Sequence, residues 1–90
     1  MPIVKFTYAL KRFFPGLKET KVHAQTVDEV IREIEKIFPG IKNYIIDDQG
    51  ALRKHVNIFI GTESVSDKLH LSDPVSDQQE IHIFQALSGG

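Results

Sequence analysis

The two glycines at the end of the sequence are the residues whose type and position point most directly to chemistry. Gly89 and Gly90 follow an apolar stretch and Ser88. Glycine has no Cβ, so such an end can extend into a narrow active site and adopt backbone angles that other residues avoid. It would present a C-terminal carboxylate, which is a poor electrophile until it is converted into a mixed anhydride. The alternative is a flexible end without a function.

No side chains form a pattern typical of a catalytic or metal site. The sequence contains no cysteine, which excludes a disulfide, a thiol nucleophile and a Cys-based zinc site. We expect no metal site either, because no two histidines have the i, i+4 spacing of a helical metal pair. The four histidines are His23, His55, His70 and His82. The acidic pairs Asp47-Asp48 and Glu33/Glu35 are typical of solvated surfaces.

The composition indicates one small domain. Ninety residues with 41% hydrophobic content can form a single modest core. The net charge of -1 includes no basic block, so we expect no nucleic-acid binding. No apolar run approaches the roughly 18 residues that span a bilayer, and Met1–Lys5 does not resemble a signal peptide. We therefore expect a soluble, cytoplasmic protein that does not bind membranes.

The strongest local pattern predicts a helix that begins after Thr26. Thr26 and Glu29 have the spacing of a capping box, in which the hydroxyl and the carboxylate each accept a backbone N–H. Pro39-Gly40 ends the helix because proline cannot continue the hydrogen-bond ladder. Between these signals one apolar stripe runs at helical spacing: Val27, Val30, Ile31, Ile34, Ile37 and Phe38.

Alternating apolar residues predict strands at 3–10, 20–25, 53–60 and about 80–87. In the first strand the alternation places Val4, Phe6, Tyr8 and Leu10 on one side, although Tyr8 could also face the other way. Pro15-Gly16 predicts a turn before the second strand. The residues expected to face inward in the last two strands are Val56, Ile58, Ile60, Ile81, Ile83 and Leu87. The pattern of residues 41–51 is ambiguous: Ile41, Ile45 and Ile46 fit a short helical turn, in which case Asp48-Gln49-Gly50 forms a loop.

This order of elements predicts an α+β fold. One helix with one apolar stripe covers one face of a mixed, four- or five-stranded sheet, and the first and last strands can pair in parallel at its centre. We expect a domain over residues 1–87 and a tail over 88–90.

Three segments carry a resemblance to a known family. They are 26–31 at the start of the helix, 56–60 in the third strand and 81–90 at the end. In these segments and in its element order the sequence resembles the ubiquitin-like β-grasp sulfur carriers. That superfamily includes the molybdopterin-synthase small subunit and the carriers for thiazole, cysteine and methionine synthesis. The long 41–51 stretch and residues 53–57 are more similar to the amino-acid-biosynthesis carriers than to the shortest thiazole carriers.

The resemblance implies a function for the tail. In the family, an activating enzyme related to ubiquitin-activating enzymes uses ATP to adenylate the C-terminal glycine, and a sulfur donor then replaces AMP to give a thiocarboxylate. Gly90 would be the reacting residue and Gly89 its neighbour in the active site. The chain would be a protein cosubstrate that binds no cofactor itself. Its implied partners are the activating adenylyltransferase/sulfurtransferase, a sulfur-accepting synthase and, where residues follow Gly90, a tail-processing protease.

The strand pattern also predicts a docking face. If the inward residues of the last two strands face the helix, then Phe59, His82 and Phe84 share the outer face of these adjacent strands. Aromatic residues dominate interface energies, so these three, with Leu87 and Ser88 leading to the glycines, are the expected partner-binding residues. Exposed aromatics without any role are the alternative. For Phe13-Phe14 we favour packing on the core over a second contact surface.

Three other functions share parts of this pattern. A ubiquitin-like modifier would be joined through Gly90 to lysines of other proteins after the same activation step. A molybdopterin-synthase small subunit would form a stable complex with a larger catalytic chain. A plain interaction domain would not need the Gly89-Gly90 end.

Overall fold

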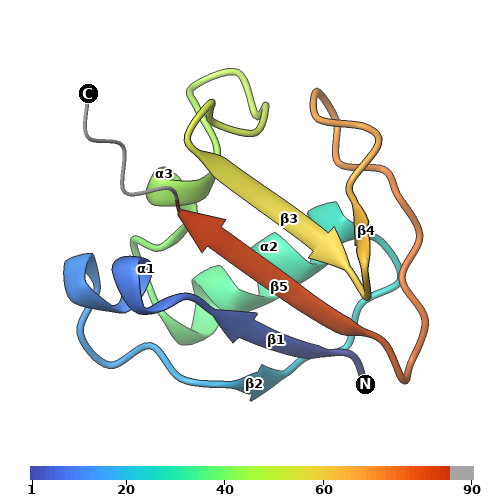
Figure 1. Ribbon diagram of the computed structural model, residues 1–90, viewed down its shortest axis with the longest axis horizontal. Coiled ribbons are helices and arrows are strands. Elements are labelled where there is room, and N and C mark those ends of the chain that lie inside the picture. The colour runs from blue at the N-terminus through green and yellow to red at the C-terminus, as the bar shows by residue number, and fades with distance from the viewer. Residues whose placement is uncertain (86–90) are drawn as a thin grey trace.

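A mixed five-stranded sheet with helix α2 packed across one face forms the centre of the fold (Figure 1). The computed structural model describes residues 1–85. The strand order in the sheet is β2-β1-β5-β3-β4. The elements in chain order are β1 (Ile3–Phe6), α1 (Tyr8–Phe13), β2 (Thr20–Lys21), α2 (Val27–Ile37), α3 (Lys42–Ile45), β3 (Val56–Ile60), β4 (Glu63–Ser64) and β5 (Glu80–Gln85).

Strand β5 lies at the middle of the sheet between the first strand and β3. It runs parallel to β1, with Phe6 opposite Ile83, and antiparallel to β3, with Ile58 also opposite Ile83. This confirms the predicted parallel pair at the centre. Because β5 is held on both sides, its last described residue, Gln85, has a fixed position relative to the rest of the fold.

Helix α2 begins and ends at the predicted signals. The backbone N–H of Glu29 donates to Thr26 Oγ1 at 3.2 Å, as a capping box requires. The Glu29 carboxylate accepts the N–H of Gln25 at 2.7 Å, one residue earlier than in the standard motif. At the other end, Gly40 has a φ of 101°, a left-handed conformation that glycine adopts without strain.

The core lies between α2 and the inner face of the sheet. Its centre is formed by residues that are almost completely buried: Val4, Leu10, Val27, Val30, Ile31, Ile34, Ile41, Ile45, Ile58, Ile81 and Ile83. Burying one such side chain contributes about 1.5–3 kcal/mol relative to leaving it in water. Ile37 was expected in this stripe but is 49% exposed. The following residue, Phe38, takes the core position and packs edge-on against Phe6, with ring centroids 6.0 Å apart.

The predicted first strand, 3–10, is wrong beyond Phe6. The chain forms α1 instead, and its first turn is closed by the N–H of Lys11 donating to the carbonyl of Thr7 at 3.2 Å. Ala9 and Leu10 point into the core from this helix, whereas Tyr8 is 76% exposed. The spacing Phe6, Ala9, Leu10 also fits a helix, because periods of 2 and 3.6 residues cannot be separated over so short a segment.

Other elements are shorter than predicted. Strand β2 is only Thr20–Lys21, although Val22 and Ala24 are buried as their alternation indicates. No pattern in the sequence predicted β4, which has only two residues. Within 41–51 the helical alternative is correct and forms α3. Strand β5 is described as far as Gln85, so residues 86–87 of the predicted last strand lie outside the described residues.

Candidate docking site at the end of β5

The end of β5 is held between α1 and the start of β3. The N–H of Gln85 donates to Thr7 Oγ1 at 3.3 Å, and the N–H of Thr7 donates to the carbonyl of Ile83 at 3.1 Å. On the other side, Gln85 pairs with Val56, the first residue of β3. The site residues Leu87, Ser88, Gly89 and Gly90 lie outside the described residues. Their roles stay predictions.

Three ring side chains gather on the outer face of the sheet near this end. Phe59 and Phe84 have ring centroids 5.3 Å apart, and His82 and Phe84 have centroids 6.1 Å apart. Phe59 lies directly opposite His82 in the β3–β5 pair. Phe84 is 37% exposed, and the His82 side chain is 29% exposed. The predicted facing of these residues is therefore confirmed, and we call Phe59, His82 and Phe84 the aromatic patch.

An ionic cluster borders the aromatic patch toward the start of β5. The Glu80 carboxylate lies 3.3 Å from Lys5 Nζ and 3.1 Å from His82 Nε2. Contact with Lys5 first, and with His82 second, holds the pKa of Glu80 below its ordinary value. Such exposed pairs add little stability. The Glu80 contact does, however, restrain the His82 ring beside Phe84.

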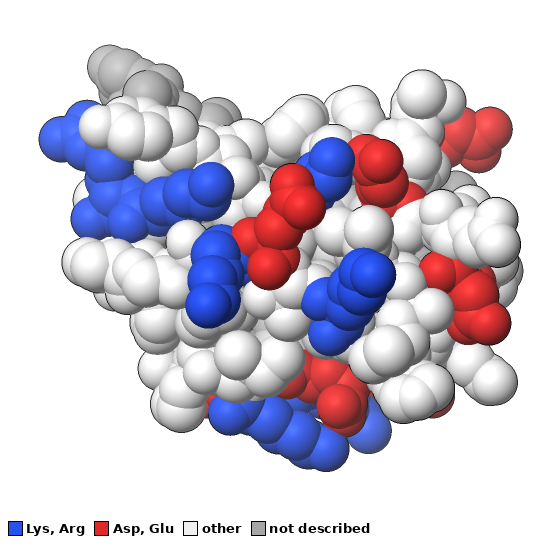
Figure 2. Space-filling model, turned by 90° about the horizontal axis from the view of Figure 1, so that it is seen from below, with Lys and Arg blue, Asp and Glu red and all other residues white. Residues whose placement is uncertain are grey.

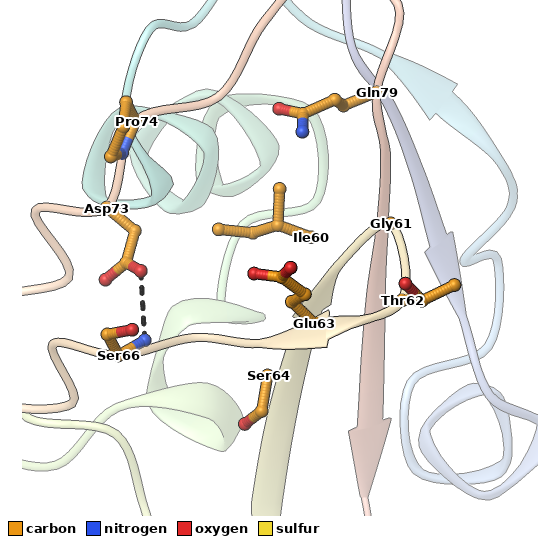
Figure 3. Close-up of a pocket in the computed structure, with 9 residues that line it drawn as sticks. All are labelled: Ile60, Gly61, Thr62, Glu63, Ser64, Ser66, Asp73, Pro74 and Gln79. Atoms are coloured by element: carbon orange, nitrogen blue, oxygen red, sulfur yellow. Dashed lines mark hydrogen bonds between the residues drawn. The ribbon is translucent and has the colours of Figure 1, made fainter.

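A hollow of about 460 Å³ lies at the opposite end of β5 (Figure 3). Its lining is Ile60, Gly61, Thr62, Glu63, Ser64, Ser66, Asp73, Pro74 and Gln79. The N–H of Gly61 donates to the carbonyl of Glu80, the first residue of β5. At about 3.3 Å per strand residue, the hollow is about 17 Å from the tail end of the strand.

Asp73, one of the two acidic residues that line this hollow, has a structural role. The Asp73 carboxylate accepts the backbone N–H groups of Ser66 at 2.9 Å and Asp67 at 2.8 Å, and the first bond is drawn in Figure 3. It therefore fixes the loop that follows β4. Within residues 1–85, no group of three His, Cys, Asp or Glu side chains is placed to hold a metal ion. The same part of the chain has no helix long and apolar enough to cross a membrane.

The aromatic residues of α1 and the segment after it have different environments. Phe14 packs against the core and lies edge-on to Tyr44, with ring centroids 6.0 Å apart. Phe13 is 54% exposed. The expectation that both phenylalanines pack on the core is therefore correct only for Phe14. Sequence reasoning missed the exposed face of α1 because it assigned residues 8–10 to a strand.

The sheet order, the central parallel β1–β5 pair and the single long helix across one face define a ubiquitin-like β-grasp domain. The particular family follows from the sequence match. The ThiS family matches residues 9–90, so the chain belongs to it. This confirms the resemblance to the β-grasp sulfur carriers.

Individual relatives agree with this assignment. The sulfur carrier protein CysO of Mycobacterium tuberculosis is 29% identical over 77 residues, which cover 83% of each chain. A chain of the crystal structure of the Amycolatopsis orientalis BexX/CysO complex superposes with a TM-score of 0.84 at 25% identity, covering 100% of both chains. SAMP1 of Haloferax volcanii shares the fold at a TM-score of 0.78 and 21% identity, covering 99% of this chain and 98% of that one.

Proposed function

We propose that this chain is a sulfur carrier protein that reacts through the carboxylate of Gly90. A carboxylate oxygen attacks the α-phosphorus of ATP in the active site of an activating enzyme, and pyrophosphate leaves. A sulfur nucleophile then attacks the carbonyl carbon of the acyl adenylate, and AMP leaves with the electron pair of the broken C–O bond. The product is a C-terminal thiocarboxylate, which delivers sulfur for the synthesis of an amino acid or a cofactor.

The observation that carries this proposal is the ThiS family match, because it extends through Gly89 and Gly90 to the end of the chain. The nucleophile in the first step belongs to the main chain, so the mechanism needs no catalytic side chain on the carrier. The chain is then a cosubstrate, and the ATP is bound by its activating enzyme.

The arrangement at the end of β5 supports a docking role for the aromatic patch. Gln85 is hydrogen-bonded to Thr7 and paired with Val56, so residues that follow it start from a fixed point. Phe84 precedes that point directly, and Phe59 lies beside it. A partner that binds these rings would have the tail within reach of its active site, with Leu87 and Ser88 as the entering segment.

Two protein partners act in succession in this proposal. The first is the activating adenylyltransferase/sulfurtransferase, and the second is the synthase that accepts the sulfur. The CysO chain in the Amycolatopsis structure is in a complex with BexX, which supports the use of this fold as a docking partner. If residues follow Gly90 in the primary product, a protease removes them. The reaction uses ATP and takes place in the cytoplasm.

A bulky residue at the end of the chain tests the mechanism. Gly90→Trp should abolish thiocarboxylate formation, because an indole does not fit the narrow site that accepts a glycine end. Gln78→Trp places the same ring at an exposed position just before β5, at the opposite end of the strand from the tail. This variant should react like the wild type. Both variants should retain the wild-type circular dichroism melting curve. Thiocarboxylate formation by Gly90→Trp at the wild-type rate would refute the proposal.

Two further outcomes would identify the other functions. ATP-dependent covalent adducts with lysines of other proteins would indicate a modifier. A stable heterodimer with a larger catalytic chain on co-expression would indicate a molybdopterin-synthase small subunit.

A further inference from the structure

Basic and acidic residues are unevenly distributed along the sequence. Residues 6–18 contain Lys11, Arg12 and Lys18 and no acidic residue, and 49–62 contain Arg53 and Lys54 and no acidic residue. Residues 63–80 have the opposite character, with Lys68 as their one basic residue. Their acidic residues are Glu63, Asp67, Asp73, Asp77 and Glu80.

The two segments that lack acidic residues meet at the end of β5. Thr7, which immediately precedes α1, is hydrogen-bonded to Gln85, and Val56, which immediately follows 53–55, is its strand partner. Figure 2 shows basic side chains at the left end of one face, where α1 lies in Figure 1, whereas basic and acidic side chains are mixed from the middle rightward. The end of β5 that leads to the tail is therefore flanked by basic residues on two sides.

One face of α1 combines positive charge with an exposed aromatic ring. Tyr8, Lys11 and Arg12 are spaced at i, i+3 and i+4, so they share the side of the helix that faces away from the buried Ala9 and Leu10. All three are exposed. The Tyr8 ring supplies apolar contact area at low entropic cost, and the two cations supply charge.

These cations are not neutralised within the described part of the chain. Lys11, Arg12 and Lys54 form no ion pair with any of residues 1–85. The carboxylates of Glu35 and Asp47 are bound by backbone N–H groups and form no ion pair with these three cations. Glu35 accepts the N–H groups of Gly40 at 2.9 Å and Lys42 at 2.8 Å, and Asp47 accepts those of Gln49 and Ala51.

We propose that Tyr8, Lys11, Arg12 and Lys54, the basic collar, form a second docking surface that binds acidic side chains at the entrance of the activating enzyme's active site. The inference rests on the proposed function, because a protein that admits the tail must surround Gln85. The aromatic patch would contact it on the outer sheet face. Tyr8, Lys11 and Arg12 would contact it on the α1 side, and Lys54 would contact it beside the start of β3. Complementary charge would increase the association rate and fix the orientation of the carrier.

Single-stranded nucleic acid is the competing occupant, since it also binds aromatic rings next to cations. The observations favour a protein. The net charge is -1, and the acidic segment 63–80 would repel a phosphate backbone that extended along the domain.

Charge reversal with a matched control tests the proposal. Lys11→Glu/Arg12→Glu changes the collar, and Lys21→Glu/Arg32→Glu makes the same change in net charge elsewhere. Lys21 pairs with Ile3, at the far end of β1 from α1, and Arg32 is exposed on α2. The readout is ATP–pyrophosphate exchange by the host's activating enzyme, measured against carrier concentration at about 50 mM and about 300 mM NaCl.

The collar variant should raise KM for the carrier about tenfold at low salt, with kcat unchanged, and the difference should shrink at high salt. The control variant should keep a KM close to the wild type. Equal changes in both variants, or an unchanged KM for the collar variant, would overturn the proposal. Circular dichroism melting of each variant shows whether it is folded.

A second measurement separates this proposal from the proposed function. If the wild-type chain is not activated at all, the sulfur-carrier function fails, but the collar can still be tested with poly-L-glutamate as an acidic polypeptide. Titration into ¹⁵N-labelled protein should shift the amide resonances of residues 8–13 and 53–55. Shifts concentrated at Lys18, Lys21 or Arg32 would refute the collar. Tighter binding of a short oligouridylate than of polyglutamate at the same residues would also refute the proposal, because the collar would then bind a nucleic acid and not a protein.

Discussion

The rings of Phe59 and Phe84 lie 5.3 Å apart on neighbouring antiparallel strands, on the face of the sheet that α2 does not cover. Phe84 is followed by Gln85, which is hydrogen-bonded to Thr7 at the start of α1. A partly exposed aromatic pair therefore lies directly beside the point from which the chain continues to its glycine end. Under the proposed function, a partner would bind the folded domain and the tail together at this point.

Removing the two rings should impair docking and leave the domain folded. We expect Phe59→Ala/Phe84→Ala to raise KM for the carrier in the activation reaction by about 30-fold or more, because central aromatic residues contribute about 2 kcal/mol or more to an interface. The free energy of unfolding should fall by only about 1–2 kcal/mol, since both rings are partly exposed and their mutual contact contributes about 0.5–1.5 kcal/mol. Steady-state kinetics and urea denaturation measure the two effects.

Leu69 provides the control for this double variant. It is an exposed apolar side chain in the acidic segment and is not part of the aromatic patch. Leu69→Ala should change neither the KM nor the stability measurably. An unfolded Phe59→Ala/Phe84→Ala protein would mean that the two rings belong to the core.

Shortening a side chain on the inner face of β3 should lower stability and leave docking unchanged, the opposite of removing the aromatic rings. Ile58 is fully buried next to Phe59 in sequence, so Ile58→Ala should lower the free energy of unfolding by about 2–5 kcal/mol. Its KM for activation should be unchanged at a temperature at which the variant is folded. A large KM effect in a folded Ile58→Ala protein would argue against a division of β3 into a core face and a docking face.

The N-terminus of α2 depends on a single hydroxyl. Thr26 Oγ1 accepts the N–H of Glu29, and Thr26→Ala should therefore cost about 1 kcal/mol of stability. Thr26→Ser retains the acceptor and should recover most of the loss. Thermal denaturation of the three proteins gives the comparison, and an equal loss in both variants would show that the methyl group of Thr26, and not its hydroxyl, matters.

The loop after β4 should make stability depend on pH in the acidic range. Hydrogen bonds from the Ser72 hydroxyl and then from the His70 N–H lower the pKa of Asp67 from 3.8 to about 2. Since the folded-state pKa is below the unfolded one, this contribution is complete above pH 3.8 and is lost as the pH falls toward about 2. Asp67→Asn should be less stable than wild type near neutral pH, and the difference should shrink as the pH falls through this range.

Urea midpoints across that pH range measure this effect. Asp48→Asn is the control, because Asp48 is exposed and its carboxylate accepts no hydrogen bond from the described residues. It should follow the wild-type curve. A gap between Asp67→Asn and wild type that stayed constant with pH would show that the ionised carboxylate is not the stabilising group.

Local signals were sufficient to predict α2 and the facing of two strands. The helix has a cap at Thr26, an apolar stripe and a stop at Pro39, all within one segment. In β3 and β5 strict alternation distinguishes the buried Ile58 and Ile83 from the outward Phe59 and Phe84. Such assignments need only the period of the pattern, which is a property of the sequence.

Features that depend on contacts between distant segments could not be predicted in the same way. The Gln85–Thr7 hydrogen bond joins residues 78 positions apart and places α1 beside the end of β5. Without it, Lys11 and Arg12 are two surface cations with no relation to the tail. Tertiary packing also decides that the chain forms a helix and not a strand from Tyr8 onward. The sequence of this segment fits a helix and a strand equally well, and the packing of Ala9 and Leu10 on the core selects the helix.

The intact mass of the protein after incubation with ATP, a sulfide source and the host's activating enzyme tests the central claim most directly. The account predicts a gain equal to the mass difference between one sulfur and one oxygen atom, located at Gly90 and absent when Gly90 is deleted. An unchanged mass, with an activating enzyme shown to be competent on another carrier, would contradict the sulfur-carrier function.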